Sequence, residues 1–369
     1  MAKKKKVDKL PDGVRGTIQK KYGKIIESGT TVLEQLGEMK VLSVSPAIDL
    51  ALGGGLREGQ VVVLTGDPKT GKTTTALYAA AKAQSQGKKV YYLNTEGRLT
   101  KHNFTGIKGL DTDAIEIIQS TDDKPMVSAE TYLNVMERLI KEEENLFLIC
   151  DSTSNMVPQD ELDGEIRTGV RNALPRLLSM FFKRISGDMS RMKAIGVFIT
   201  HNIANTGGSR FAPNKMADCG NMLQFQAGTN MVITHRGKWE VPKESGNHVG
   251  QIANWMVKTS ASGGTPLTQF QSWIRYGVGI DEAQELAQIA TEFALIQAKG
   301  AWYTFSSLVE DREQKVVSDW LTHNHPSSVT EEDVTKVFKF QGMEKVTNFL
   351  NENDCLKEYL YSQVRELFE

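Results

Sequence analysis

Short apolar segments recur along the first two thirds of the chain, each bounded by polar or glycine-rich turns. The clearest lie at residues 61–65, 90–94, 146–150 and 195–200. Several are continuously apolar rather than alternating, which is typical of strands that are buried on both faces. Helical patterns separate these strands, for example at residues 73–84 and 132–144. The alternation predicts an α/β fold whose central, mostly parallel sheet is covered by helices on both sides.

Two long stretches without clear periodicity interrupt this pattern, at about residues 157–170 and 202–226. Most connections within a domain are about 4 to 6 residues long, so stretches of this length usually form functional or mobile loops. Insertions that the fold merely tolerates are the alternative. A β-rich pattern then returns at residues 254–258 and 270–274, and a helical pattern follows it to the end of the chain.

The patterns divide the chain into three predicted parts. They are an N-terminal arm at residues 1–33, a core at residues 34–281 and a small α-rich C-terminal domain at residues 282–369. In the arm, residues 17–26 favour a short basic helix and residues 30–36 favour an extended or linker segment, so a helix–strand arm is predicted. Because one short helix cannot bury its apolar face alone, the arm is expected to pack on the core or on another subunit.

The charges balance over the whole chain but not along it. The 369 residues include 44 Lys or Arg and 45 Asp or Glu, a net charge of −1, which argues against a nonspecific polycation that coats DNA or membranes. Residues 1–40 contain ten basic and five acidic side chains, whereas residues 310–369 contain seven and thirteen. Such asymmetry indicates an interaction arm or a screened binding surface, with two ordinary solvated ends as the alternative.

The composition also bears on the compartment. No apolar run approaches the roughly 20 residues that span a bilayer, and the basic N-terminus leads into a Pro-Asp-Gly turn rather than a hydrophobic signal core. The protein is therefore expected in the cytoplasm, without a membrane partner. Cys150, Cys219 and Cys355 show neither paired nor metal-type spacing, as is typical of a reducing compartment. The six histidines are equally scattered, and no zinc site is predicted.

The sharpest motif follows the first of the predicted strands and opens a helix. It has the complete pattern G-x-x-x-x-G-K-[ST], formed by Gly66, Asp67, Pro68, Lys69, Thr70, Gly71, Lys72 and Thr73, and Thr74 follows it. Glycines let the backbone wrap closely around a phosphate, and the amides at the helix N-terminus add positive charge. Lys72 is expected to reach the β- and γ-phosphates of ATP, and the Thr73 hydroxyl to bind Mg²⁺.

Polar residues at the ends of other predicted strands extend this site, because the carboxyl ends of parallel strands meet at one edge of the sheet. Asp151 is placed to hold the metal directly or through water, with a helix N-cap as the alternative. Glu96 is placed to orient or deprotonate water, although a surface glutamate fits the local pattern nearly as well. His201 precedes the second long loop and is a candidate sensor of the nucleotide, with an ordinary strand-end histidine as the alternative.

Motifs on both sides of the phosphate loop resemble those of the bacterial RecA recombinases and their bacteriophage relatives. They are IQKKYGK at residues 18–24, IDLALGGGL at residues 48–56, YGVGI at residues 276–280 and GAWY at residues 300–303. The resemblance extends over nearly the whole chain. It implies a RecA-like P-loop ATPase core, a helical filament that binds ATP, Mg²⁺ and single-stranded DNA, and strand exchange with homologous double-stranded DNA.

The same resemblance implies roles for individual residues. Lys72 and Thr73 correspond to ligands of phosphate and Mg²⁺, Glu96 to the carboxylate that activates water, and Asp151 to the second residue of the metal site. The two long stretches correspond to DNA-binding loops. Their candidate DNA contacts are Arg167, Gly169, Arg171, Gly207, Gly208, Arg210 and Lys215.

Other correspondences concern the subunit interface and the base of the nucleotide. Tyr276 resembles the residue that packs near the adenine, and Phe225 resembles an aromatic that relays across the interface. Lys258 resembles the first of two lysines that reach ATP on the neighbouring subunit, but Ser260 stands where the second is usual. A serine hydroxyl cannot replace an ammonium group beside developing phosphate charge. The serine at this position favours a phage or otherwise divergent branch. His201 stands where bacterial members usually have Gln and resembles the His of some phage members.

Two other functions would use the same nucleotide site. A hexameric RecA-like DNA helicase forms closed rings, and a regulatory or mediator protein of recombination binds ATP as a switch without DNA-stimulated turnover. The main hypothesis is a DNA-dependent ATPase that assembles head to tail into an open helix.

Overall fold

The computed structural model describes residues 12–164, 173–204, 215–217, 221–242, 244–326 and 330–367, with the backbone alone at residues 12, 203, 204, 215–217, 221 and 222. The chain forms two compact units, Met1–Lys40 and Val41–Glu369. No helix in these described ranges is both long enough and apolar enough to cross a membrane.

The first unit contains two helices, α1 (Asp12–Tyr22) and α2 (Gly29–Gly37). The expectation of an extended segment at residues 30–36 was therefore wrong. Ser28 caps α2 by accepting a hydrogen bond from the Thr31 backbone N–H at 3.1 Å. This cap, together with the Leu-Glu-Gln-Leu sequence that follows, outweighs the β-branched residues that favoured an extended chain.

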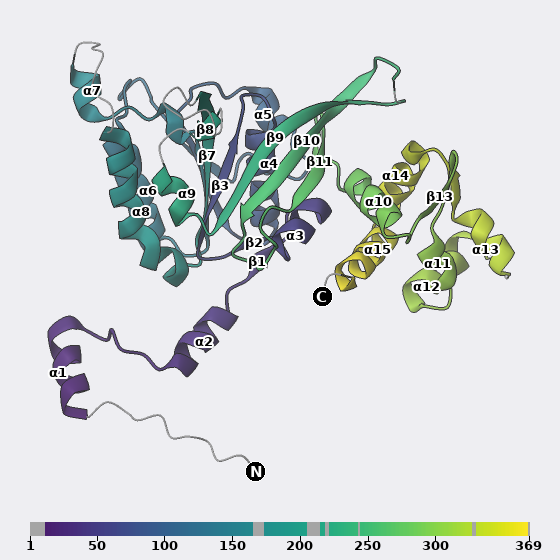
Figure 1. Cartoon of the computed structure of the whole chain (residues 1–369), viewed down its shortest axis with the longest axis horizontal. Coiled ribbons are helices and arrows are strands. Elements are labelled where there is room, and N and C mark those ends of the chain that lie inside the picture. Colours follow the sequence, from purple (N-terminus) through teal and green to yellow (C-terminus); the bar gives the residue numbers. More distant parts are fainter. Residues whose placement is uncertain are drawn as a thin grey trace, which may run out of the picture. The chain divides into compact units, whose positions relative to one another are not determined.

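In the second unit, ten strands of the described residues form one large sheet (Figure 1). These strands are β3 (Gln60–Gly66), β4 (Lys89–Asn94), β5 (Ile115–Ile118), β6 (Leu146–Asp151), β7 (Ile195–Ala204), β8 (Lys215–Ala217), β9 (Thr229–Glu240), β10 (His248–Thr259), β11 (Gln269–Arg275) and β12 (Gly279–Ile280). A separate antiparallel pair joins β1 (Val41–Leu42) to β2 (Leu56–Arg57).

The large sheet has a parallel half and an antiparallel half that meet beside β3. Its order is β12-β11-β10-β9-β3-β7-β6-β4-β5, with β8 paired to β7. From β9 to β5 every neighbouring pair along this order is parallel, as the apolar strand pattern predicts. Strands β9 to β12 pair antiparallel, so the sheet as a whole is mixed.

Helices cover both faces of the sheet, and alternate residues of each strand pack on opposite sides. Val62 and Leu64 of β3 pack with α3 and α4, whereas Val61 and Val63 pack with α6 and α8. The helices of this part are α3 (Pro46–Leu52), α4 (Lys72–Ser85), α5 (Lys101–Thr105), α6 (Ala129–Glu142), the 3₁₀ helix η1 (Thr153–Asn155), α7 (Gln159–Asp163), α8 (Ala173–Arg191) and α9 (Asn221–Gln226).

The two long stretches predicted as irregular contain some regular structure. Helix α7 lies in the first, and β7, β8 and α9 extend into the second. Phe225 lies on α9 and is 78% exposed. The predicted DNA contacts Arg167, Gly169, Arg171, Gly207, Gly208 and Arg210 lie outside the described residues, and only the backbone of Lys215 is described, at the start of β8.

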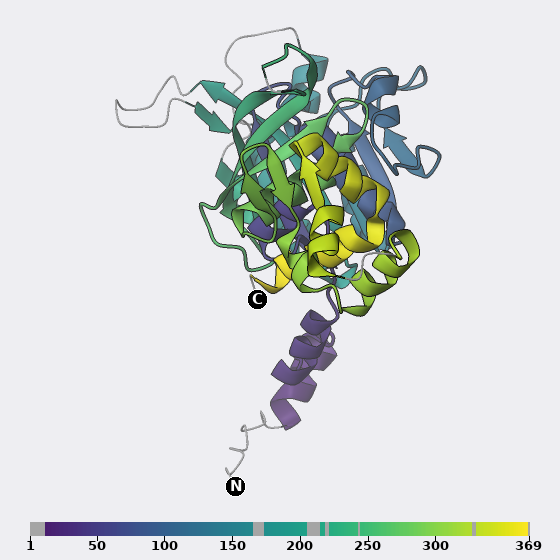
Figure 2. The same cartoon turned by 90° about the vertical axis from the view of Figure 1, so that its right-hand side faces the viewer.

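The C-terminal part is rich in helices, as predicted, and also holds a small sheet that the sequence pattern did not indicate (Figure 2). Its elements are α10 (Glu282–Glu292), β13 (Gln297–Lys299), β14 (Trp302–Thr304), α11 (Ser306–Glu310), α12 (Lys315–Asn324), α13 (Glu331–Val337), β15 (Lys339–Gln341), α14 (Met343–Glu352) and α15 (Asp354–Glu366). The three strands are three residues long, too short for an alternation of apolar and polar residues to be recognised. This part has its own hydrophobic core, centred on side chains such as Phe305 and Phe338.

Candidate functional site

The phosphate loop connects β3 to α4 and is shaped by left-handed backbone at two positions. Gly71, the N-cap of α4, has φ 108°, and a Cβ atom there would lie 2.3 Å from Cδ1 of Ile274. The positive φ therefore favours glycine at this position, and a larger residue would also displace the end of the Ile274 side chain. Lys69, with φ 60°, also adopts a conformation that is uncommon outside glycine.

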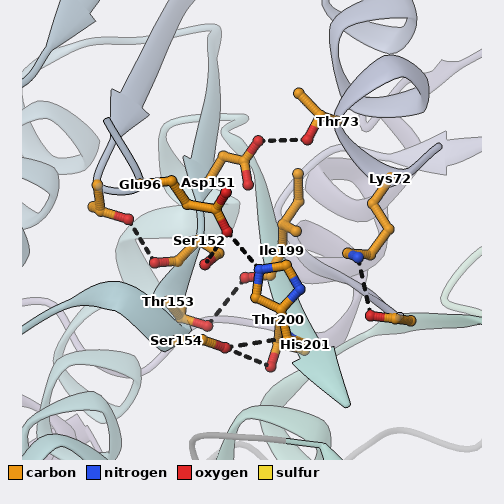
Figure 3. Close-up of polar contacts among 12 residues, drawn as sticks. Lys72, Thr73, Glu96, Asp151, Ser152, Thr153, Ser154, Ile199, Thr200 and His201 are labelled. Atoms are coloured by element: carbon orange, nitrogen blue, oxygen red, sulfur yellow. Dashed lines mark hydrogen bonds and ion pairs between the residues drawn. The ribbon is translucent and has the colours of Figure 1, made fainter. Parts of the chain in front are cut away.

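The side chain of Lys72 is buried beneath this loop. Its Nζ donates hydrogen bonds to the carbonyl oxygens of Gly66 at 2.9 Å and Asp67 at 2.8 Å. Figure 3 shows Lys72 with one of these two contacts. Burial lowers the pKa of Lys72 to about 8, and the negative charges of Asp151, Glu96 and Asp67 oppose that shift. The ammonium form therefore predominates at neutral pH, where it complements the charge of a phosphate.

Thr73 and Asp151 come together from α4 and β6. The Thr73 hydroxyl donates to Oδ2 of Asp151 at 2.6 Å, and the Tyr92 hydroxyl donates to the same oxygen at 2.7 Å. Burial raises the pKa of Asp151, so a bound cation would favour its ionised form. A hydroxyl and a carboxylate are oxygen ligands of the kind that Mg²⁺ prefers, and this pair therefore fits such an ion.

Glu96 and His201 form the second close pair. Glu96 follows the end of β4, and His201 lies in β7. Oε1 of Glu96 lies 2.5 Å from Nε2 of His201 and accepts a hydrogen bond from Oγ of Ser152 at 3.2 Å. The hydrogen bond with His201 is the main reason that the pKa of Glu96 is below its usual value. Nδ1 of His201 is buried and has no hydrogen-bond partner among the described residues. Glu96 is thus a positioned, ionised carboxylate.

These groups line one cavity of about 600 Å³. The sequence-predicted residues in its wall are Pro68, Lys69, Thr70, Gly71, Lys72, Thr73, Thr74, Glu96, Asp151, His201 and Tyr276. Gly66 and Asp67 lie behind this wall and hold Lys72 through their carbonyl groups. The structure therefore brings together nearly all of the predicted nucleotide site at the carboxyl edge of the parallel strands.

Several residues of the wall were not predicted from the sequence. They are Tyr92, Asn94, Arg98, Leu99, Thr100, Asn103, Arg236 and Gln251. Five of them, from Asn94 to Asn103, lie on the segment that contains Glu96. This segment follows the end of β4, and that position was a signal that could have identified them. Arg236 and Gln251 belong to the antiparallel strands, whose register the sequence pattern does not specify.

Two residues of the predicted subunit contact lie outside the cavity wall. Lys258 is exposed near the end of β10. Ser260 donates a hydrogen bond to the Leu52 carbonyl at 2.6 Å and accepts one from the Ser262 backbone N–H at 3.2 Å. Its hydroxyl therefore anchors the turn after β10 to the end of α3.

The chain is similar in sequence to RecA proteins over most of its length. Residues 12–281 match the family described as the RecA N-terminal domain. The chain is 31% identical over 334 residues to "Protein RecA" of Limosilactobacillus reuteri, a match that covers 89% of this chain and 87% of that protein. It is 27% identical over 354 residues to "Protein RecA" of Halalkalibacterium halodurans, covering 95% and 88%. For "Protein RecA" of Thermotoga neapolitana the identity is 26% over 374 residues, covering 100% and 95%.

Proposed function

This chain belongs to the RecA family, and on that premise we propose that it is an ATP-dependent DNA recombinase whose ATP hydrolysis is stimulated by single-stranded DNA. The observation that carries the proposal is the convergence of the phosphate loop, the Thr73–Asp151 pair and the Glu96–His201 pair on one cavity. The cavity is large enough for a nucleotide. Its wall combines phosphate-binding backbone with an ionised carboxylate.

Glu96 is the proposed base of the hydrolysis reaction. Its carboxylate orients a water molecule and accepts a proton from it as the water oxygen attacks the γ-phosphorus of ATP. The bond between that phosphorus and the bridging oxygen then breaks, which releases ADP. The lowered pKa of Glu96 keeps it ionised at neutral pH, and its hydrogen bonds with His201 and Ser152 fix its orientation.

Lys72, Thr73 and Asp151 are the proposed ligands of the phosphates and of Mg²⁺. Lys72 exchanges its contacts with the loop carbonyls for contacts with phosphate oxygens, and the N-terminus of α4 adds its amide groups. The hydrogen bond between Thr73 and Asp151 supports their assignment as ligands of the ion, since it brings two oxygen ligands together. When bound, Mg²⁺ neutralises charge that develops on the phosphate oxygens.

His201 is the proposed link between the nucleotide and DNA. It contacts Glu96 through its ring, and β7 continues from it to Ala204, into the second predicted DNA-binding loop at residues 202–226. A change at the γ-phosphate that moves Glu96 would therefore act on the start of that loop. We infer that Arg167, Arg171, Arg210 and Lys215, with the neighbouring glycines of both loops, contact the DNA backbone.

Filament assembly is the proposed role of the arm at residues 1–33. Apolar side chains of its helices are exposed, for example Val14 at 51% and Leu33 at 70%, which is typical of a surface that a partner covers. We propose that the arm packs on the core of the next subunit, that Lys258 reaches the ATP bound by a neighbouring subunit, and that Tyr276 packs near the adenine. The protein is proposed to act in the cytoplasm.

An ATPase assay with and without single-stranded DNA tests this function. We expect a large rise in turnover when the DNA is added, and helical filaments in electron micrographs taken with ATP and DNA. Closed rings would instead indicate a helicase. ATP binding without any DNA-stimulated turnover would indicate a regulatory protein, and either result would contradict the proposal.

A further inference from the structure

Arg236 on β9 reaches the phosphate loop from a neighbouring strand. Its Nη1 donates a hydrogen bond to the Lys69 carbonyl oxygen at 3.1 Å, and its side chain forms part of the wall of the nucleotide cavity. The two residues are far apart in sequence, so the contact depends on the fold. The guanidinium group has five N–H donors in a planar arrangement, and this contact uses one of them.

An irregularity in the strand pairing explains why Arg236 points toward the cavity. Ile233 pairs with Trp255 and packs against Gly66 of the phosphate loop, whereas Arg236 pairs with Ala253. Residues three apart on a regular strand face opposite sides, but the register shifts between these two pairs. One extra residue on β9 is thereby accommodated, which returns Arg236 to the face of Ile233.

The residues around Arg236 on this face allow its side chain to lie along the sheet. Its cross-strand neighbour Ala253 is small and fully buried, and Gln251, two residues along β10 on the same face, also lines the cavity. The residues that follow a bulge often mark a functional position, because the bulge changes the direction in which a side chain points.

The charges of the wall favour a role for this cation. Lys72 is held at the base of the loop by two carbonyl groups, and the carboxylates of Glu96 and Asp151 bring negative charge to the same cavity. ATP would add several more negative charges. Because a guanidinium binds phosphate through two parallel hydrogen bonds, Arg236 offers more than a point charge.

We propose that Arg236 binds a phosphate group of the nucleotide held in the same chain, with the Lys69 carbonyl holding its guanidinium in place. This inference rests on the proposed function of the cavity as an ATP site. It assigns the antiparallel half of the sheet a direct contribution to nucleotide binding, since Arg236 lies on β9.

Equilibrium binding of a fluorescent ATP analogue to the full chain, with Mg²⁺, tests the assignment. We expect Arg236→Ala to raise the Kd by about 10- to 100-fold, which corresponds to the loss of one charge-assisted contact. Inorganic tripolyphosphate, used as a competitor, should lose affinity by a similar factor. Lys238→Ala is the matched control, because Lys238 is an exposed cation on the same strand and face but lies outside the cavity wall. Its Kd should stay within twofold of the unsubstituted chain.

Arg236→Gln separates a phosphate contact from simple support of the loop. Glutamine retains an N–H group for the Lys69 carbonyl but has no charge, so we expect it to bind ATP as weakly as Arg236→Ala. Normal affinity in Arg236→Gln, or tripolyphosphate competition that Arg236→Ala leaves unchanged, would overturn the assignment. An unsubstituted chain that fails to bind the analogue would instead contradict the proposed function. The thermal midpoint of each variant without nucleotide verifies that it is folded.

Discussion

Among the described residues, the Glu96 carboxylate makes both of its side-chain hydrogen bonds through one oxygen. His201 and Ser152 both approach Oε1, and Oε2 has no hydrogen bond with another described side chain. A water molecule can therefore approach Oε2 while the carboxylate stays fixed. This arrangement suits a base that must be oriented before ATP hydrolysis begins.

The substitution Glu96→Gln removes the charge of this carboxylate with little change in its size. We expect Glu96→Gln to lower kcat for ATP hydrolysis by about 10²- to 10⁴-fold, since an amide cannot accept the proton of the attacking water. The Kd of ATP should change by only a few-fold. Glu116→Gln, an exposed glutamate on β5, is the control for both measurements. Turnover at the normal rate in Glu96→Gln would show that another group activates the water.

The affinity for ATP should depend on pH through the charge of Lys72. Burial gives Lys72 a pKa of about 8, so the free site loses this positive charge as the pH rises above 8. We expect the Kd of ATP to be steady from pH 7 to 8 and to increase at higher pH, approaching tenfold per pH unit. In Lys72→Arg, whose guanidinium stays protonated, the Kd should be independent of pH over this range. An equally flat profile for the unsubstituted chain would contradict the lowered pKa.

At the scale of residues, the sequence predicted those parts of the site that are close in the chain or end a strand. The phosphate loop, Glu96, Asp151 and His201 are of this kind, and they converge on the cavity. The sequence did not predict Arg236, because its position depends on a register shift between two antiparallel strands. Such a shift leaves no hydrophobic pattern that differs from a regular strand.

At the scale of elements, a buried polar network joins segments at the amino ends of the strands, opposite the cavity. Nζ of Lys88 lies 2.5 Å from Oε1 of Glu58 and 2.6 Å from Oδ1 of Asn145, and both charged side chains are 2% exposed. The network thereby connects the residues that precede β3, β4 and β6. Removal of Lys88 or Glu58 would take away the opposite charge from a side chain in a place that water does not reach.

Substitution of Lys88 tests the contribution of this network to stability. We expect Lys88→Met to lower the free energy of unfolding by about 3–5 kcal/mol, since the buried Glu58 carboxylate then loses the ammonium group of Lys88. The double variant Lys88→Met/Glu58→Leu should regain much of that loss, because no buried charge remains. Urea unfolding measures both values, and Lys89→Met, which removes a more exposed lysine of β4, is the control. Similar stability of the single and double variants would contradict the buried-charge explanation.

The elements also differ in how well the sequence predicted them. The parallel strands were recognised because burial on both faces makes them continuously apolar, as in Leu146–Asp151. Helix α2 was missed because residues 30–32 near its start are β-branched, and its cap at Ser28 was not recognised. The small C-terminal sheet was missed because its strands are short and because one of its two pairings, β14 with β15, joins residues 35 to 39 positions apart.

In the molecule as a whole, the described residues of the second unit form three hydrophobic cores. Two lie on opposite faces of the large sheet, and the third lies in the C-terminal part. Buried polar contacts join the C-terminal part to α3: the Ala47 backbone N–H donates to Glu285 at 3.0 Å, and the Tyr361 hydroxyl donates to Asp49 at 2.8 Å. The second unit therefore has the packing that independent folding requires. The first unit, by contrast, has no buried residue in α2.

Because the two units differ in this way, deletion of the first should affect assembly and not the folding of the second. We expect deletion of residues 1–40 to leave the thermal midpoint of the remaining chain within a few degrees of the full chain, because the three cores remain intact. The same deletion should abolish filaments in electron micrographs with ATP and single-stranded DNA, since the proposed contact with the next subunit is lost. Filaments of normal length from the truncated chain would contradict the proposed role of the arm.

A smaller change can locate that contact on α2. Leu33 and Leu36 are 70% and 45% exposed and lie three residues apart, so their side chains share one face of the helix. If this face packs on a neighbouring core, Leu33→Ser/Leu36→Ser should shorten or abolish the filaments without lowering the thermal midpoint. Gln35→Ala, a polar residue of the same helix, should leave filament length unchanged. Equal filament lengths in all three proteins would show that the apolar face of α2 is not the contact surface, even if the deletion has its expected effect.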